Sequence, residues 1–168
     1  KAIEDGHNDF LELLLSVDKE KFDLELHCGN YSMLNLQQAS TKVSNVSDIA
    51  GYVLSSVVSN YPLRNESLCN AGVLALTREA SSFKGHGVVF EIEEFLNLKD
   101  SFEIPPNQSC IDRISQEHGI IKDRLLKLGQ GLAILPQHAC IVAACYPFYV
   151  ITDESHKVTD IWVPCKGW

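Results

Sequence analysis

Short apolar segments, bounded by glycine, proline and small polar residues, recur along this chain and constrain its fold more than any other feature. Their length is typical of strands, whereas an amphipathic helix needs a longer run with a period of about 3.6 residues. We therefore predict strands at residues 72–77, 87–92, 111–115, 130–135, 148–152 and 158–163.

Two more strands are predicted nearer the start of the chain. In residues 22–27 apolar and polar side chains alternate, as in a half-buried strand. After the turn Cys28-Gly29-Asn30, a second strand covers residues 31–39. Residues 98–109 contain Pro105-Pro106 and show no period, so we predict a surface loop there.

Short helices complete the predicted elements. The first is capped by Asn8 or Asp9 and ends near Ser16. The second is capped by Ser47-Asp48 and ends at Tyr61-Pro62, because apolar residues recur between them at helical spacing: Ile49, Tyr52, Val53, Val57 and Val58. We expect a mainly β (α+β) fold, an antiparallel β-barrel-like domain or a sandwich with a few short helices.

Size and charge exclude several classes of protein. A chain of 168 residues with 45% hydrophobic content can bury a core, so we expect residues 1–168 to form a single domain. The net charge of −8 leaves no basic surface for phosphate backbones, and nucleic acid is not an expected partner. No apolar run approaches the roughly 20 residues that cross a bilayer, so no membrane partner is expected either.

The cysteines and the first residue bear on where the protein works. The six cysteines form no C-x-x-C pair, which favours free thiols in a reducing compartment and hence a cytoplasmic location. A secreted location is indicated instead by four N-x-S triplets, which would accept glycans in a secreted chain. They begin at Asn30, Asn45, Asn65 and Asn107. Because the chain begins with Lys1, we expect it to be a piece of a longer polypeptide.

The segment Pro136-Gln137-His138-Ala139-Cys140 is the first candidate for chemistry. In extended backbone, residues i and i+2 project to the same face, so His138 and Cys140 could offer an imidazole nitrogen and a thiolate to one metal ion. These are zinc ligands, and a two-ligand clamp would leave positions open for water or substrate, as in catalytic sites. The alternatives are a buried cysteine beside a hydrogen-bonded histidine, and a closed structural zinc site with two further protein ligands.

Two other segments carry candidate residues. Ser115-Gln116-Glu117-His118-Gly119 places a carboxylate and an imidazole beside a glycine turn, where they could orient a metal ligand or contact a substrate. A polar turn with Gly119 at positive φ explains the same residues. His27-Cys28-Gly29-Asn30-Tyr31 delivers a tyrosine from a turn, although a tyrosine there is more often a packed ring.

Taken together and in order, several segments resemble the carboxy-terminal domain of eukaryotic, especially fungal, D-serine dehydratases. The likeness runs from about residue 22 to Trp168. The segments are His27-Cys28-Gly29-Asn30-Tyr31, Leu36-Gln37-Gln38, Tyr61-Pro62-Leu63-Arg64, Asn70-Ala71-Gly72-Val73, Leu76-Thr77-Arg78-Glu79-Ala80-Ser81, Ser115-Gln116-Glu117-His118-Gly119, Leu135-Pro136-Gln137-His138-Ala139-Cys140 and the stretch that starts at Asp160-Ile161-Trp162.

The resemblance implies a two-domain enzyme related to D-threonine aldolase and alanine racemase, with an amino-terminal barrel that holds pyridoxal phosphate and a β-rich second domain. It implies a zinc ion bound by His138 and Cys140, a Schiff-base lysine on the absent barrel, and a homodimer. Tyr31 would approach the cofactor, and Gln116, Glu117 and His118 would contact substrate or support the metal ligands. The implied reaction converts D-serine to pyruvate and ammonia, and this domain alone would be inactive.

Three departures from the family pattern stand out, because relatives carry tyrosine, aspartate and aspartate where this chain has Leu34, Asn35 and Asn70. Three functions remain open. The chain could serve a D-serine dehydratase, a D-threonine aldolase-like enzyme for another β-hydroxy amino acid, or a non-enzymatic zinc-binding β-domain. An isolated half of such an enzyme would also expose apolar surface and self-associate.

Overall fold

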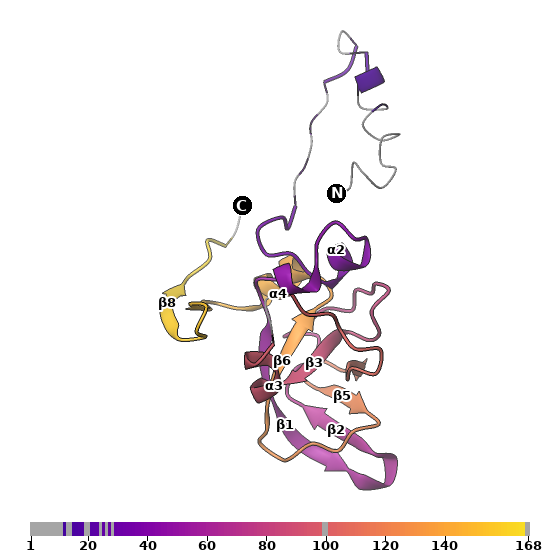
Figure 1. Cartoon of the computed structure of the whole chain (residues 1–168), viewed down its shortest axis with the longest axis vertical. Coiled ribbons are helices and arrows are strands. Elements are labelled where there is room, and N and C mark those ends of the chain that lie inside the picture. The colour runs from indigo at the N-terminus through magenta and orange to yellow at the C-terminus, as the bar shows by residue number, and fades with distance from the viewer. Residues whose placement is uncertain are drawn as a thin grey trace.

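A computed structural model describes residues 12, 15–18, 21–23, 25, 27, 29–98 and 101–166. Within them the chain is mainly β (Figure 1). The strands are β1 (Val53–Tyr61), β2 (Glu66–Cys69), β3 (Gly87–Glu91), β4 (Ile111–Ile114), β5 (Gly119–Lys122), β6 (Gly131–Pro136), β7 (Tyr149–Thr152) and β8 (Val158–Trp162). The helices are α2 (Leu36–Ser40), α3 (Ile92–Leu96) and α4 (Ala139–Cys145), with 3-10 turns η1 (Val46–Asp48) and η2 (Pro62–Arg64).

Six strands form one antiparallel sheet in the order β3-β6-β1-β2-β5-β4. Its two outer strands approach each other through a bridge between Val88 and Cys110, and the Val89 amide donates to the Ser109 carbonyl at 2.8 Å. The sheet therefore curls on itself, which reduces the open edges that a flat sheet would leave. The predicted antiparallel, barrel-like fold is confirmed.

Two apolar clusters bury both faces of β3 and β6. One face packs into the interior of the curled sheet, with Val89 and Ile134 among its members. The other face is covered by loop side chains around Phe90, whose ring centroid lies 5.9 Å from those of Phe95 and Phe102. Burial on both sides explains why β6 reads as a continuous apolar run without alternation.

Five of the predicted strands are confirmed, because the ranges 87–92, 111–115, 130–135, 148–152 and 158–163 correspond to β3, β4, β6, β7 and β8. The described part of 98–109 contains no helix or strand, as predicted. The cysteines at 69, 110, 140, 145 and 165 are free, whereas Cys28 lies outside the described residues. Among the described helices, none is both long and apolar enough to cross a membrane.

The helix predicted after Ser47-Asp48 is wrong. Only the 3-10 turn η1 forms there, and the following residues make the long strand β1. Val53 and Val57 are buried and Leu54 and Val58 exposed, which is the alternation of a strand. A spacing of four residues fits either period, and the β-branched valines of this segment favour the strand.

Other expected elements near the start of the chain are also wrong or untested. Residues 31–39 form a turn followed by α2 instead of a strand, and residues 72–77 are turns. The described residues of 22–27 belong to no strand. The predicted helix that ends near Ser16 falls largely outside the described residues.

The strand register gathers many connections at one end of the sheet. β1, β3 and β5 begin there, and β2, β4 and β6 end there. We call this the α4 end; it comprises residues 30–41, 70–86, 115–118 and 137–146. Figure 1 shows α2 and α4 next to each other beyond the end of β6. Loops at the ends of a rigid sheet are where proteins commonly place functional groups.

Candidate functional site

Three of the segments that resemble the D-serine dehydratase family touch one another at the α4 end. The Gln37 amide nitrogen donates to the Gln137 carbonyl at 3.3 Å. The side-chain Nε2 of Gln37 donates to Glu79 Oε2 at 3.3 Å and to the Ala80 carbonyl at 3.2 Å. Segments that are distant in the sequence therefore converge where His138 and Cys140 lie.

The buried side chain of Gln137 joins the end of β6 to residues 81–85. Its side chain is fully buried, and Nε2 donates to the carbonyls of Phe83 and Gly85 at 3.1 and 2.7 Å. Its Oε1 accepts from Ser81 Oγ at 2.8 Å. The amide is thus satisfied at both ends, as a buried amide must be. Sequence reasoning gave this residue no role, although a glutamine directly after a buried strand is a signal of such a network.

His138 and Cys140 stand at the start of α4. His138 is the N-cap residue in extended backbone (φ −139°, ψ 101°), and its carbonyl accepts from the Val142 amide at 3.3 Å. Cys140 already belongs to the helix. The expectation that both lie in extended backbone is therefore wrong for Cys140. The helix forms because Ala139 and Val142, three residues apart, both face the core.

The described residues supply two metal donors here and no complete metal site. His138 is half-buried and Cys140 exposed, and neither side chain is engaged in a hydrogen bond within the described part of the chain. Both are zinc donors by chemistry. Among the described residues no group of three His, Cys, Asp or Glu side chains could hold a metal ion. The residue types therefore suit zinc, but the described residues do not form a complete site.

Tyr146 anchors the other end of α4. Its hydroxyl donates to the Ala75 carbonyl at 3.2 Å, which ties the helix to the 70–86 loop. Burial, with a smaller contribution from the charge of Cys145, raises the pKa of Tyr146 to about 12. The phenol is thus held neutral as a donor.

Because the pKa of Tyr146 is raised on folding, its contribution to stability is fully present below its unfolded pKa of about 10 and is lost as pH rises towards 12. We expect the free energy of unfolding to fall between pH 10 and 12 more steeply in the parent chain than in Tyr146→Phe. Urea denaturation at stepped pH measures this difference. Parallel pH profiles for the two proteins would contradict the raised pKa.

The Ser115–Gly119 segment forms the turn between β4 and β5. The Ser115 amide donates to the His118 carbonyl at 2.9 Å, and the Val73 and Leu74 amides donate to the Ser115 and Gln116 carbonyls at 2.9 and 3.1 Å. The side chains of Gln116, Glu117 and His118 are exposed, and no hydrogen bond joins these described residues to His138 or Cys140. The turn thus reaches α4 through the 70–86 loop, which Tyr146 contacts.

Two glycines shape this turn by close packing. A Cβ on Gly72 would lie 2.4 Å from the Gln116 carbonyl oxygen, and one on Gly119 would lie 2.7 Å from the Ala71 carbonyl oxygen. Gly119 is not at positive φ, so the expectation of a left-handed glycine there is wrong. It is instead the first residue of β5, a strand that the sequence pattern did not reveal.

Tyr31 lies on an exposed turn next to α2. Its side chain is 75% exposed. The turn is closed by a bond from the Leu34 amide to the Asn30 carbonyl at 3.0 Å, and Asn30 Nδ2 donates to Gln38 Oε1 at 3.0 Å. The hydrogen bonds hold the turn in place, and the exposed Tyr31 side chain is available for contact with another domain or subunit.

Two of the departures from the family pattern retain an acceptor. Asn35 is the N-cap of α2, and its Oδ1 accepts from the Gln38 amide at 3.1 Å. The Oδ1 of Asn70 accepts from Ser55 Oγ and the Ser56 amide, both at 2.9 Å. A carboxylate oxygen would accept the same hydrogen bonds as these amide oxygens, so asparagine keeps the acceptor at both positions without a charge.

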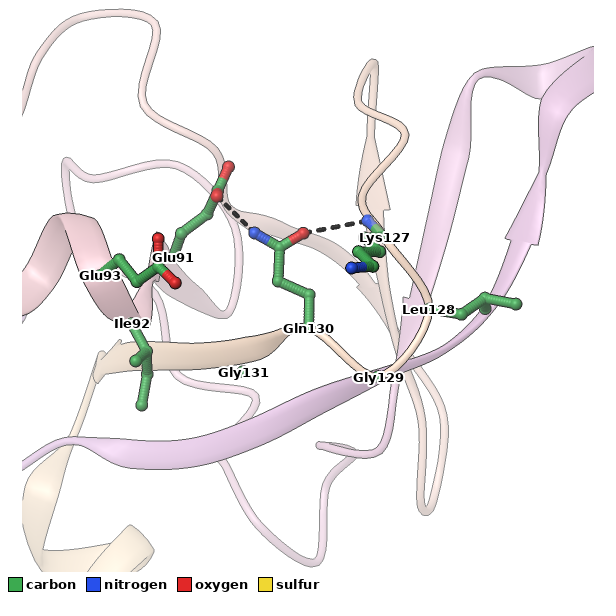
Figure 2. A pocket seen from close by; sticks show the side chains of 8 residues that line it. All are labelled: Glu91, Ile92, Glu93, Lys127, Leu128, Gly129, Gln130 and Gly131. Carbon is green, nitrogen blue, oxygen red and sulfur yellow. Dashed lines mark hydrogen bonds between the residues drawn. The ribbon is translucent and has the colours of Figure 1, made fainter.

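A pocket of about 440 Å³ lies at the opposite end of β6 from His138. Its lining is Glu91, Ile92, Glu93, Lys127, Leu128, Gly129, Gln130 and Gly131. Figure 2 shows that Gln130 bridges Glu91 and the Lys127 amide, so its amide is already used within the protein. The pocket therefore holds none of the sequence-predicted site residues.

Comparison with known proteins gives one family and several relatives. Residues 50–152 match the model of the family described as "Putative serine dehydratase domain". Over 152 residues the chain is 43% identical to the D-serine dehydratase of Saccharomyces cerevisiae, a match that covers 86% of this chain and 35% of that enzyme. The chain thus spans about a third of the length of the curated relatives it matches.

Solved structures share the fold. An alanine racemase-like protein from Idiomarina loihiensis is 27% identical, with a TM-score of 0.67, over 81% of this chain and 37% of that one. The D-threo-3-hydroxyaspartate dehydratase of Delftia sp. HT23 is 24% identical, with a TM-score of 0.66, over the same shares. A cysteine-to-alanine variant of that dehydratase is in a metal-free form, and a histidine two positions earlier was replaced in another variant.

Proposed function

Since the chain belongs to the serine dehydratase domain family, we propose that it is the zinc-carrying carboxy-terminal domain of a pyridoxal-phosphate-dependent D-serine dehydratase. In this proposal the complete enzyme converts D-serine to pyruvate and ammonia. The domain alone is inactive, because the cofactor and its lysine belong to an amino-terminal barrel outside residues 1–168. The full polypeptide acts as a cytoplasmic homodimer.

Two observations support this proposal above the others. The 43% identity to a D-serine dehydratase extends over 152 residues, and the recognised segments around Gln37, Glu79 and Gln137 are in contact at one end of the fold. Segments that are distant in the sequence but in contact in the fold support a shared role better than a motif alone.

His138 and Cys140 are the proposed metal ligands. Their side chains offer a nitrogen and a sulfur, the donor types that zinc prefers, and both are accessible. A bound zinc ion would supply Lewis-acid assistance to the departing β-hydroxyl group. In the Delftia dehydratase a metal-free form accompanies loss of a cysteine, and the replaced histidine precedes it by two positions. The H-x-C spacing of this chain is the same, which supports the assignment.

The remaining candidates act around that pair. Pyridoxal phosphate, held mainly by the absent barrel, supplies the electron sink for the reaction. Gln116, Glu117 and His118 are exposed on one turn, so they are available to orient the substrate or a metal ligand. Tyr31, also exposed, is the residue proposed to approach the cofactor.

A second candidate function is dehydration or cleavage of another β-hydroxy D-amino acid. The likeness to a D-threo-3-hydroxyaspartate dehydratase favours including that substrate in any test. A D-threonine aldolase-like reaction would release glycine instead of a keto acid. A non-enzymatic zinc-binding domain would need a metal site saturated by protein ligands.

The full-length polypeptide tests these functions directly. We expect pyruvate from D-serine when the protein is loaded with pyridoxal phosphate, loss of turnover after chelation, and recovery when zinc is added back. Parallel assays with D-threonine and D-threo-3-hydroxyaspartate measure substrate choice, and residues 1–168 alone serve as the inactive control. Turnover that survives complete removal of metal would refute the role of zinc, and glycine from D-threonine without pyruvate from D-serine would favour the aldolase.

A further inference from the structure

Strands β7 and β8 form a two-stranded sheet of their own. Figure 1 shows this hairpin standing beside the body of the domain rather than within the curled sheet. The Tyr149 hydroxyl donates to the Ala143 carbonyl at 3.0 Å, which fastens the base of the hairpin to α4. A two-stranded ribbon is at best marginally stable in water without further packing. The ring of His156, in the turn of the hairpin, also lies 6.5 Å from that of Phe95. These few contacts leave most of the hairpin without packing from the described residues.

One face of the hairpin is apolar and uncovered. Val150 and Ile161 are directly paired across the strands. Phe148 and Val163 each lie one residue beyond a strand, and continued alternation would place them on the same side. These four side chains are 49%, 58%, 50% and 75% exposed, in that order. We call them the Val150 face. A contiguous exposed apolar surface on an ordered element marks an interaction site.

The opposite face and the turn are already organised. Trp162 Nε1 donates to Asp160 Oδ2 at 3.0 Å, and both lie on the side away from Ile161. At the turn, Asp153 Oδ1 accepts from Ser155 Oγ at 2.6 Å and from the Lys157 amide at 3.0 Å. These bonds, the side-chain bond from Ser155 first, lower the pKa of Asp153. These bonds fix the conformation of the turn and of the opposite face, so the Val150 face is held on an ordered hairpin.

We propose that the Val150 face docks on the part of the longer polypeptide that lies outside residues 1–168. This rests on the proposed function, in which the domain belongs to such a polypeptide. The curated relatives are about three times as long as the matched region, so a covalently attached partner of sufficient size is available in the family.

The size of the face selects this occupant over a second copy of the chain. Complete burial of four side chains that are already half covered removes on the order of 300 Å² of apolar surface. A stable complex between separate molecules buries about 800 Å² on each partner. An attached partner needs far less, because tethering replaces the entropy cost of association with a high effective concentration.

Hydrogen exchange of the full-length polypeptide tests the proposal with a matched pair of variants. Ile161 and Trp162 are neighbours on β8 and are both 58% exposed. They point to opposite faces, since Ile161 pairs with Val150 and Trp162 pairs with Tyr149. We expect Ile161→Lys to accelerate amide exchange in β7 and β8 at least about tenfold, because it places a charge in the interface. Trp162→Lys should leave the exchange within about twofold of the parent protein, because it adds the same charge to the opposite face.

Three results would overturn the proposal. They are rapid exchange of the hairpin in the parent protein, equal effects of the two variants, and protection that disappears on dilution, which would identify a second copy as the occupant. Circular dichroism of both variants checks that the fold is retained. Hydrogen exchange requires neither bound metal nor turnover. A full-length protein without dehydratase activity would therefore contradict the proposed function, but the docking could still be tested on it.

Discussion

Replacing His138 or Cys140 by alanine in the full-length polypeptide should remove bound zinc and lower D-serine turnover at least about 100-fold. Loss of a group that merely supports a metal ligand costs about 10–100-fold, and loss of one of two protein ligands should cost more. Metal content by mass spectrometry and pyruvate release, measured on the same samples, give the two effects. They should fall together, because the proposed role of the metal is catalytic.

Cys145→Ala is the matched control. Cys145 lies on the same helix as Cys140 and is likewise an exposed free cysteine, with its thiol directed to the Ile141 carbonyl. Its replacement should leave zinc content and turnover unchanged. If all three variants keep their zinc, His138 and Cys140 are structural residues and the metal assignment is wrong.

Replacing Gln137 by leucine should lower the free energy of unfolding by about 3 kcal/mol. The change leaves the carbonyls of Phe83 and Gly85 and the hydroxyl of Ser81, all partly buried, without the Gln137 side chain as a partner. Each buried polar group that loses its partner costs about 1–3 kcal/mol. Urea denaturation of residues 1–168, followed by circular dichroism, measures the loss.

Gln116→Leu provides the comparison at an exposed site. It is the same substitution at the same end of the fold, but the Gln116 side chain is exposed and makes no hydrogen bond within the described residues. We expect a change within about 0.5 kcal/mol there. Similar losses in the two variants would mean that the Gln137 network does not stabilise the end of β6.

Much of the fold could be predicted because short strands leave a local mark in the sequence. β3 and β6 are apolar runs between glycine or polar boundaries, and their type follows from length and composition. β1 could not be read correctly, because Val53 and Val57 fit both periods and the choice between helix and strand depends on pairing with distant strands. The strand predicted at 72–77 failed for the same reason, since that segment is apolar but bonded to the turn at 115–116.

The sequence allows zinc ligands to be proposed by residue type, and that assignment stays a prediction, whereas the geometry of the candidate site could not be predicted. The residue types at His138 and Cys140 point to zinc from the sequence alone. Their backbone does not, because the start of α4 depends on burial of Ala139 and Val142 against segments far away in the chain. Gln137 was overlooked for a related reason: its partners at 81–85 are brought beside it only by the pairing of β3 with β6.

The α4 end is held in shape mostly by carboxamides. Its side-chain hydrogen bonds are donated or accepted by the amide groups of Asn35, Gln37, Gln38, Asn70 and Gln137. One of their partners is a carboxylate, that of the exposed Glu79. Carboxamides do not titrate between acid and alkaline conditions, whereas imidazoles and thiols do. The hydrogen bonds that shape the α4 end should therefore persist over a wide range of pH.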